Sequence, residues 1–213
     1  MNLTLDVGNT QAKLAVFDDK LLEAKSFDSK YIYDNINDFL KLFPLIKNLI
    51  VCSVVDTDLN FDSYNFQNIH FVSNNSKLPF INLYDTKKSL GNDRIALVSR
   101  AAIKFSNQNV LIIDAGSCIT YDFINENNQY LGGAISPGLN MRFKSLNHFT
   151  SNLPLVKSLT ESINIGKTTY DSISKGVCSG VNYEIEGFIN QYSSKYKNLT
   201  VILTGGDADK LSN

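Results

Sequence analysis

The sequence predicts an α/β protein made of two related halves, each with a mixed β-sheet flanked by helices. One observation behind this prediction is a pattern that occurs twice: an apolar strand that ends in Asp-x-Gly, a polar pair, and a second apolar strand. The two copies span residues 3–17 and 111–123, with Asp6 and Asp114 at matching positions. The other observation is that β-prone stretches alternate with stretches whose apolar residues have helical spacing.

Each copy of the repeated pattern predicts a strand, a tight turn and a returning strand, with a carboxylate near the end of the first strand. Gly8 and Gly116 occupy the third position, where glycine permits a disfavoured turn and lets a ligand approach the backbone. Two unrelated hairpins are the alternative, and the matching register argues against it. Two such turns facing each other could hold a polyphosphate through backbone N–H groups and a carboxylate-bound cation. Neither GxxxxGK[ST] nor GxGxxG after a strand occurs, which excludes the nucleotide sites that those motifs form.

The remaining elements follow from apolar spacing and turn residues. In the first half we expect a helix over residues 34–43, strands over 49–55 and 69–72, and a helix that begins at Asn92 as its N-cap. In the second half we expect a strand over residues 110–114, helices over 139–149 and 169–192, and a strand over 200–204. The boundary falls between Asn107 and Val110, which predicts domains at residues 1–108 and 109–213.

The composition excludes several classes of function. The 213 residues carry 20 Lys and Arg against 21 Asp and Glu, so the chain lacks the positive surplus that binds nucleic acid through a general field. The three cysteines are far apart, without CxxC spacing or nearby His pairs, which predicts reduced thiols and no structural zinc. No basic region precedes an apolar run at the N-terminus and no stretch reads as a membrane span, so we expect a cytoplasmic protein without a signal peptide.

Short motifs in a fixed order carry a resemblance that extends from Met1 to about Asp207. These are DVGNT at residues 6–10, GNDR at 91–94, DAGSCIT at 114–120, GGAISPG at 132–138, TYDSISKG at 169–176 and TGG at 204–206. In these motifs the chain resembles the type III pantothenate kinases, which belong to the superfamily of acetate and sugar kinases, Hsp70 and actin. Each motif is weak alone, but GxDR together with GGxIxPG separates this family from other kinases of the superfamily.

The resemblance implies two ribonuclease-H-like halves of the actin and Hsp70 type. It also implies that ATP phosphorylates the primary hydroxyl of pantothenate to give 4′-phosphopantothenate, the first step of coenzyme A biosynthesis. Such a transfer needs positioned phosphates, a cation and an acceptor for the hydroxyl proton. The resemblance implies Mg²⁺ bound with ATP, and Asp93 as the general base. The plain alternative for Asp93 is an acidic residue in the first turn of a helix, where the helix dipole favours it.

On the ATP side, the resemblance implies that the first turn holds the phosphates and that Asp6 lies near their Mg²⁺. Lys13 would reach a phosphate as a point charge, and a solvated strand lysine is its alternative. Ser117 matches an ATP-contacting Thr, because this chain has Ser-Cys where the family usually has Thr-Ala. The implied ATP-binding residues are Asp6, Val7, Gly8, Asn9, Thr10, Gln11, Ala12, Lys13 and Ser117.

On the acceptor side, the implied pantothenate-binding residues are Tyr84, Gly91, Asn92, Asp93, Arg94 and Thr169. The planar guanidinium of Arg94 suits the carboxylate of pantothenate, and a surface salt bridge is its alternative. Thr169 matches a contact that comes from the partner subunit of a homodimer, and its alternative is an N-cap or first-turn residue of the long helix. Chance placement among ten Tyr residues is the alternative for Tyr84.

In the second half, Asp114 matches the position at which the family binds a monovalent cation, K⁺ or NH₄⁺. We expect the GGAISPG segment to be a loop whose backbone comes close to another group and helps to shape the cleft. Gly205 and Gly206 resemble the adenosine-side turn of the superfamily, and relatives generally continue beyond it with a closing helix and strand, whereas this sequence ends at Asn213.

Two other classes of function stay open. The first is another kinase or a phosphatase of the same superfamily, which would share the twin turns but would not require GNDR or GGAISPG. The second is an ATP-binding accessory regulator of transcription, related to the Bvg accessory factor. The acidic isoelectric point of about 6.1 and the lack of a basic stripe argue against direct DNA binding.

Overall fold

The computed structural model of the chain describes residues 1–55, 58–156 and 164–211. Residue contacts divide it into two compact units, Met1–Leu78 with Asp85–Arg100, and Pro79–Tyr84 with Ala101–Asn213. The division falls within helix α2 (Asn92–Lys104) and does not coincide with the domains at residues 1–108 and 109–213, which stay a prediction.

The first unit contains a five-stranded mixed sheet in the order β3-β2-β1-β4-β5. Its strands are β1 (Asn2–Val7), β2 (Ala12–Asp18), β3 (Lys20–Phe27), β4 (Asn48–Ser53) and β5 (Asn68–Phe71). The first three form an antiparallel meander, and β4 and β5 continue the sheet parallel to β1. The other elements that lie wholly in this unit are α1 (Ile32–Leu42) and the 3₁₀ turns η1 (Ser29–Tyr31) and η2 (Lys87–Ser89).

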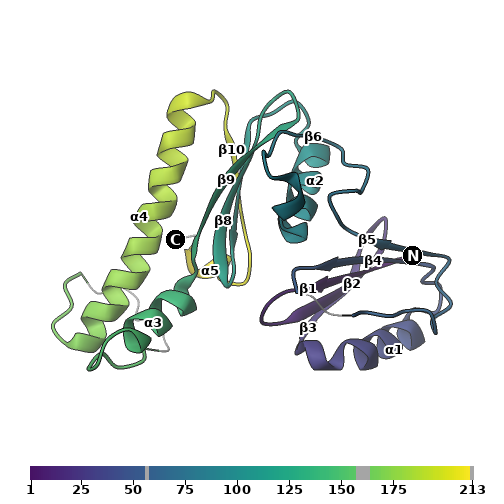
Figure 1. Cartoon of the computed structure of the whole chain (residues 1–213), viewed down its shortest axis with the longest axis horizontal. Helices are drawn as coiled ribbons and strands as arrows, with labels where there is room; N and C mark the ends of the chain where they lie inside the picture. Colours follow the sequence, from purple (N-terminus) through teal and green to yellow (C-terminus); the bar gives the residue numbers. More distant parts are fainter. Residues whose placement is uncertain (56–57, 157–163, 212–213) are drawn as a thin grey trace. The chain divides into compact units, whose positions relative to one another are not determined.

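The core of the first unit lies between α1 and one face of the sheet (Figure 1). Alternate residues of a strand point to the same face, and Leu3, Leu5 and Val7 of β1 are accordingly buried. Ile36 and Phe39 of α1 pack in the same cluster. This alternation directs Asp6, between Leu5 and Val7, to the other face of the sheet.

The second unit contains another five-stranded sheet, in the order β10-β7-β8-β9-β6. Its strands are β6 (Ile81–Asn82), β7 (Val110–Ala115), β8 (Cys118–Ile124), β9 (Gln129–Pro137) and β10 (Thr200–Thr204). β7, β8 and β9 form an antiparallel meander, with β10 parallel to β7 and β6 parallel to β9. The helices of this unit are α3 (Leu139–His148), α4 (Thr169–Lys195) and α5 (Ala208–Leu211).

Helix α4 runs along one face of the second sheet, and α3 packs beside its N-terminal part (Figure 1). Val177, Val181 and Ile185 of α4 share a buried cluster with Leu111 and Ile113 of β7. The predicted fold class, α/β with mixed sheets flanked by helices, is therefore confirmed. Within the described ranges, no helix has the length and apolarity needed to cross a membrane.

The GGAISPG segment is not the predicted loop, because it forms most of strand β9. A Cβ on Gly133 would lie only 1.5 Å from the carbonyl oxygen of Tyr121 in β8, so glycine permits the close pairing of these strands. The register shifts between Phe123 and Ile124, and Gly132 has a φ of 101°, as at a β-bulge. The glycines of this segment therefore permit close approach of two strands. The prediction of a loop was wrong because glycine is common in loops as well as at such positions within strands.

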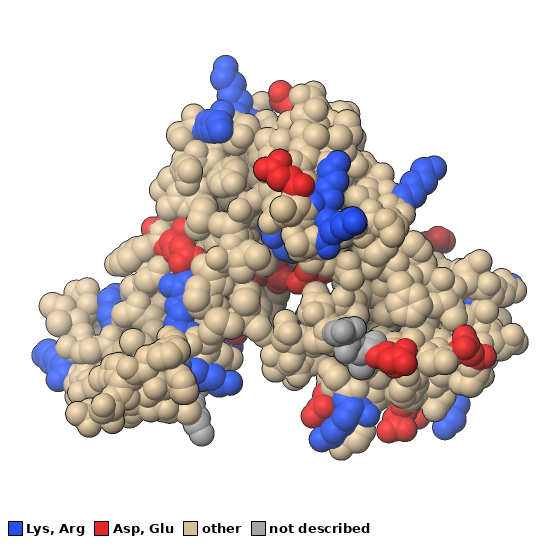
Figure 2. Space-filling view, viewed as in Figure 1, with Lys and Arg blue, Asp and Glu red and all other residues tan. Residues whose placement is uncertain are grey.

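The charged side chains of both units are mixed in sign. On the face that Figure 2 shows, Lys and Arg lie interspersed with Asp and Glu over each unit. No continuous basic patch is visible on that face among the described residues. This agrees with the formal net charge of −1.

Candidate active site

The turn between β1 and β2 is the first predicted phosphate-binding segment. The N–H of Gly8 donates to the carbonyl of Gln11 at 3.0 Å and closes the turn. Val7 and Ala12 on either side are buried and anchor the turn in the core of the first unit. The exposed residues at the tip are Asn9, Thr10 and Gln11.

Asp6 lies between groups of both charges. It is opposite Lys13 in the register of β1 and β2, and opposite Cys52 in that of β1 and β4. The surrounding protein desolvates the carboxylate and raises its pKa, Lys13 opposes this, and the negative charge of Asp93 raises the pKa further. The net shift is upward, and Asp93 is therefore close enough to Asp6 for the two carboxylates to repel each other.

The pKa of the Cys52 thiol is shifted mainly by burial, and also by the same two carboxylates. Burial, and after it the charges of Asp6 and Asp93, raise the pKa of the Cys52 thiol to about 12. Cys52 is thus a neutral thiol at neutral pH. Asp6 and Asp93 together offer carboxylate oxygens of the kind that bind a hard cation.

The GNDR motif spans the start of α2 and is tied to the carboxyl ends of β1 and β4. The side-chain amide of Asn92 donates to the carbonyl of Ser53 at 3.0 Å, and the N–H of Val54 donates to the carbonyl of Val7 at 3.0 Å. Asn92 is therefore the first helical residue and not the predicted N-cap; its side chain holds the helix to the sheet instead.

Glycine at position 91 leaves room for the Asp93 carboxylate. A Cβ on Gly91 would lie 2.5 Å from Oδ1 of Asp93, the atom that accepts the N–H of Arg94 at 2.8 Å. The Gly-x-Asp-Arg spacing therefore has a steric reason. Arg94 itself is only 5% exposed, which excludes the surface salt bridge considered as its alternative.

The second predicted phosphate-binding turn joins β7 to β8 and is covered by two other segments. The N–H of Gly116 donates to the carbonyl of Cys118 at 3.0 Å, and Ser117 is exposed at the tip. The N–H of Gly138 donates to the carbonyl of Ser117 at 3.1 Å. A Cβ on Gly138 would lie 2.3 Å from the carbonyl oxygen of Gly116, so a side chain there would displace the turn.

Asp114 lies against the TGG segment of the same unit. Thr204 is its partner in the parallel pairing of β7 with β10, and Gly205 follows with a φ of 99°. A Cβ on Gly205 would lie 2.5 Å from Oδ1 of Asp114 and 2.4 Å from the carbonyl oxygen of Ala115. Three of the motifs that the sequence singled out, DAGSCIT, GGAISPG and TGG, thus meet around one turn.

The donor set around Asp114 fits a monovalent cation better than a transition metal. Among residues 1–55, 58–156 and 164–211, no cluster of three or more His, Cys, Asp or Glu side chains is placed to hold a metal ion. The carboxylate of Asp114 and the carbonyl oxygen of Ala115, which both lie beside Gly205, are oxygen ligands of the kind that hard cations prefer.

Tyr84 belongs to the second unit, whereas Asp93 and Arg94 belong to the first. Its ring stacks on that of Tyr130, with the ring centres 6.0 Å apart, and lies against Gly132, where a Cβ would be 3.3 Å away. The hydroxyl of Tyr130 donates to the buried Asp122 at 2.7 Å. The orientation of Tyr84 is thus set by packing.

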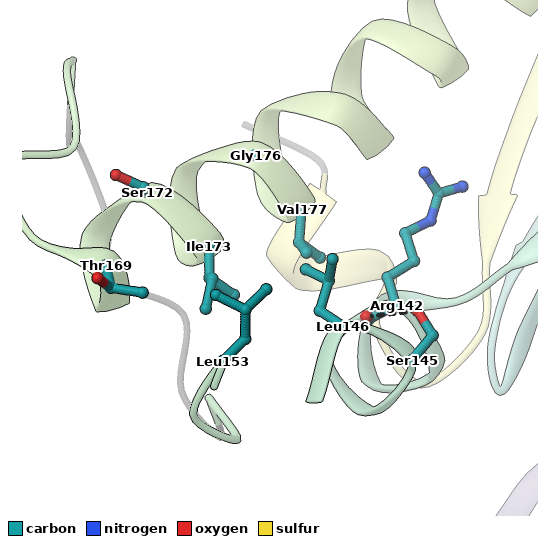
Figure 3. Close-up of a pocket in the computed structure, with 9 residues that line it drawn as sticks. All are labelled: Arg142, Ser145, Leu146, Leu153, Thr169, Ser172, Ile173, Gly176 and Val177. Atoms are coloured by element: carbon teal, nitrogen blue, oxygen red, sulfur yellow. Dashed lines mark hydrogen bonds between the residues drawn. The ribbon is translucent and has the colours of Figure 1, made fainter. Parts of the chain in front are cut away.

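Thr169 is the first residue of α4 and is exposed. The N-cap is Thr168, whose hydroxyl accepts the N–H of Asp171 at 3.1 Å, so the N-cap alternative for Thr169 is wrong and the first-turn alternative holds. Thr169 lines a groove of about 500 Å³ between α3 and α4. Figure 3 shows apolar side chains pointing toward one another in this groove, namely Leu146, Leu153, Ile173 and Val177.

Sequence reasoning missed Arg142 of α3 and Glu184 of α4, which form an ion pair beside the second turn. Arg142 follows the GGAISPG motif closely, and this is the one sequence signal that could have directed attention to it. Glu184 carries no such signal, because it lies in the middle of a long helix far from any motif.

Solved structures share the fold of this chain. A Campylobacter jejuni protein assigned to the Baf family of transcriptional activators is 25% identical, with a TM-score of 0.61 over 99% of this chain and 86% of that chain. A Sinorhizobium meliloti protein assigned as a 2-dehydro-3-deoxygalactonokinase is 9% identical, with a TM-score of 0.50 over 98% of this chain and 92% of that one. These likenesses show the fold, which is shared by proteins with different assigned functions.

Sequence comparison identifies the family. A family model described as type III pantothenate kinase matches residues 2–191. Proteins named type III pantothenate kinase include one from Flavobacterium johnsoniae, 46% identical over 100% of this chain and 88% of its own length, and one from Christiangramia forsetii, 47% identical with the same coverage. Another, from Bacteroides fragilis, is 41% identical over 97% of this chain and 86% of its own. The chain belongs to the type III pantothenate kinase family, which confirms the resemblance found in its motifs.

Proposed function

We propose that the protein is an enzyme that phosphorylates pantothenate with ATP to give 4′-phosphopantothenate, the first step of coenzyme A biosynthesis. Membership of the family supports this reaction and its substrates. The observation that carries the mechanism is the electrostatic interaction of Asp93, in the first turn of α2, with Asp6 beside the first glycine turn. This arrangement keeps a proton acceptor close to a phosphate-binding segment within a single unit.

Asp93 acts as the general base. The proton of an alcohol is far too weakly acidic for a carboxylate to remove in advance, so proton transfer accompanies bond formation. The 4′-oxygen of pantothenate bonds to the γ-phosphorus, the bond from that phosphorus to the leaving oxygen of ADP breaks, and the hydroxyl proton passes to Asp93. The hydrogen bond to Asp93 strengthens as the transition state forms, and for this reason it accelerates the reaction.

The ATP phosphates are held by the glycine turns. In the first turn we assign the contacts to Asp6, Val7, Gly8, Asn9, Thr10, Gln11, Ala12 and Lys13. Asn9, Thr10 and Gln11 are exposed and offer the most accessible groups, whereas Val7 and Ala12 are buried. Ser117 supplies a hydroxyl from the second turn. Mg²⁺, when bound with ATP, neutralises phosphate charge, and the neighbouring carboxylates of Asp6 and Asp93 are oxygen ligands that would suit such a cation.

Pantothenate is held by the GNDR segment and by residues outside it. Arg94 binds the carboxylate of pantothenate through its planar fork, while Gly91 and Asn92 shape the approach to Asp93. The aromatic ring of Tyr84 forms a further contact with pantothenate. We assign Asp114 to a K⁺ or NH₄⁺ ion, on the basis of the resemblance to the family, its carboxylate and the neighbouring carbonyl oxygen of Ala115.

We further propose a cytoplasmic homodimer in which Thr169 reaches the pantothenate site of the partner subunit. The exposure of Thr169 at the first turn of α4 supports this role. Size-exclusion chromatography with light scattering tests the dimer, and a fully active monomer would exclude a shared site.

A role in transcription is the second candidate, because the Campylobacter jejuni protein with the same fold is assigned to a family of transcriptional activators. Relatives that are 40–47% identical over nearly the whole chain are named kinases, and they outweigh one structure at 25% identity. ATP binding without any pantothenate-dependent release of ADP would favour the regulatory function.

The deciding experiment is an assay of 4′-phosphopantothenate formation by the purified protein with ATP and Mg²⁺, with K⁺ or Na⁺ as the monovalent cation. We expect turnover of pantothenate that is faster in K⁺ than in Na⁺, and a loss of this difference in Asp114→Asn. Glycerol and a hexose serve as control acceptors, and equal turnover of either would overturn the assignment of pantothenate. Equal rates in K⁺ and Na⁺ would remove the cation site at Asp114.

A further inference from the structure

A cluster of polar side chains connects α4 to the strands beside the second glycine turn. Oε1 of Glu184 accepts hydrogen bonds from the hydroxyl of Tyr121 in β8 at 2.8 Å and from the hydroxyl of Ser136 in β9 at 2.5 Å. Its other oxygen, Oε2, accepts from the guanidinium of Arg142 in α3 at 2.5 Å. One carboxylate therefore joins two helices to two strands.

The contacts continue from Arg142 to the turn itself. Nε of Arg142 donates to the carbonyl of Pro137, the last residue of β9, at 2.7 Å. The next residue is Gly138, whose N–H donates to the carbonyl of Ser117 and whose Cα packs against the carbonyl of Gly116. An unbroken series of contacts thus runs from Glu184 through Arg142, Pro137 and Gly138 to the turn that carries Ser117.

Glu184 is kept ionised within this cluster. Desolvation opposes its charge, but the hydrogen bonds from Arg142, Ser136 and Tyr121 outweigh that cost and lower the pKa of the carboxyl. The side chains of Arg142 and Glu184 are only 22% and 24% exposed, so their attraction is screened less than that of a surface pair. A charged pair that also bonds a backbone carbonyl fixes both the distance and the direction of that carbonyl.

We propose that Arg142 and Glu184 are positioning residues for ATP binding: they hold the Pro137–Gly138 peptide against the second glycine turn and thereby fix Ser117. This inference rests on the proposed function in so far as it takes ATP to be the ligand of that turn. Gly116 and Gly138 have no side chains that could hold the turn in place by packing. The hydrogen bond from Arg142 to the carbonyl of Pro137 holds the adjoining backbone instead. Loss of this hydrogen bond lets the turn that carries Ser117 move. Displacement of a substrate-positioning group by about 1 Å can lower a reaction rate by about 10²-fold.

The test measures MgATP binding in the absence of pantothenate, by calorimetry, for Glu184→Gln and Arg142→Lys. We expect roughly tenfold weaker binding in both variants, the loss that corresponds to about one hydrogen bond. Arg142→Lys is informative because lysine keeps the charge but lacks the fork that bonds Pro137 and Glu184 together. The matched control is Glu186→Gln, which removes the same charge from an exposed position on the same helix and is expected to leave binding unchanged.

Steady-state kinetics separates positioning from mere stabilisation. If the cluster positions the turn, KM for ATP rises in the folded variants while KM for pantothenate stays near the wild-type value. If the pair only supports the fold, the melting temperature falls and both KM values of the folded protein are unchanged. Where Glu184→Gln or Arg142→Lys fails to fold, Tyr121→Phe removes one hydroxyl from the cluster, and we then expect a smaller loss of ATP affinity of roughly threefold.

Wild-type ATP affinity in folded Glu184→Gln, or full affinity in Arg142→Lys, overturns the proposal. A wild-type protein that binds ATP but does not phosphorylate pantothenate refutes the proposed function only, because the binding comparison still decides the role of the cluster. Absence of ATP binding by the wild type refutes both.

Discussion

The two glycine turns share a sequence pattern, yet their surroundings differ. The first turn is closed by the bond from Gly8 to Gln11, and the nearby Asp6 feels the charges of Lys13 and Asp93. The second turn is covered by backbone, because Gly138 and Gly205 press against it without side chains. The comparison teaches that the groups beside the first turn interact mainly through charge, whereas the second turn is also confined by the space that Gly138 and Gly205 leave. Added volume should therefore affect the second turn more than the first.

The largest effect is expected from removing charge near the first turn. Asp93→Asn keeps the shape of the side chain but cannot accept the proton, so kcat should fall about 10²–10⁴-fold while affinity for MgATP is retained. Asp38→Asn, at an exposed position of the same unit, is the control. Steady-state assays and calorimetry measure the two quantities. If Asp93→Asn keeps a kcat close to that of the wild type, Asp93 is not the general base and another residue accepts the proton.

The next effect is expected from adding volume at the second turn. Gly205→Ala places a methyl group against Asp114 and Ala115 at a φ of 99°, and strain plus overpacking should lower the free energy of unfolding by about 2–5 kcal/mol. The neighbouring Gly206 has open space around its Cβ position, so Gly206→Ala should change that free energy by less than about 0.5 kcal/mol. Urea denaturation compares the two variants, and equal stabilities would contradict the steric account.

A smaller effect tests whether space matters in the first unit too. In Gly91→Ala the new methyl group pushes Oδ1 of Asp93 from its place, and kcat should fall roughly tenfold, with little change in stability because only a side chain must move. Gly187→Ala in α4 has open space at its Cβ position and serves as the control. If Gly91→Ala keeps the wild-type kcat, the glycine of GxDR is not needed to position the base.

The smallest effect concerns the pH dependence of MgATP binding. Asp6 must be ionised to hold a cation, and because its pKa is raised, binding should weaken at a higher pH than for an ordinary aspartate. Asp93→Asn removes a repelling charge and lowers the pKa of Asp6, so binding should persist to lower pH. Lys13→Met removes an attracting positive charge and raises the pKa of Asp6, so the loss of binding should begin at a higher pH. Calorimetry across about pH 4 to 7 measures both shifts, and shifts of the same sign would contradict this electrostatic account.

Much of the local structure follows from the sequence. The strand over residues 200–204 was predicted at its observed bounds, and the repeated hairpins and the helices at α1, α2, α3 and α4 were predicted within a few residues. Strands β3, β6 and β9 were not predicted, and β9 includes the segment expected to be a loop. Most of β3 is exposed, so it lacks the apolar alternation of a half-buried strand, and β6 has only two residues.

The candidate site follows from the sequence only in part. The motifs name Asp6, Asp93 and Asp114, and the burial of Arg94 removes the surface alternative for that residue. The sequence does not show that Asp93 lies close enough to Asp6 to raise its pKa. This proximity arises in the fold, where the hydrogen bond from Asn92 to Ser53 ties the start of α2 to the end of β4. The ion pair of Arg142 and Glu184 likewise becomes visible only when α3 and α4 are packed together.

The sequence by itself determined the hairpins, the periodic helices and the family, because these depend on residues close together along the chain or on motifs read in order. The tertiary structure decided which motifs meet. Parallel pairing brings Thr204 beside Asp114, and β9 returns Gly138 to Ser117. Such meetings depend on strand order and register, which are set by the burial of whole faces and not by any local run of residues.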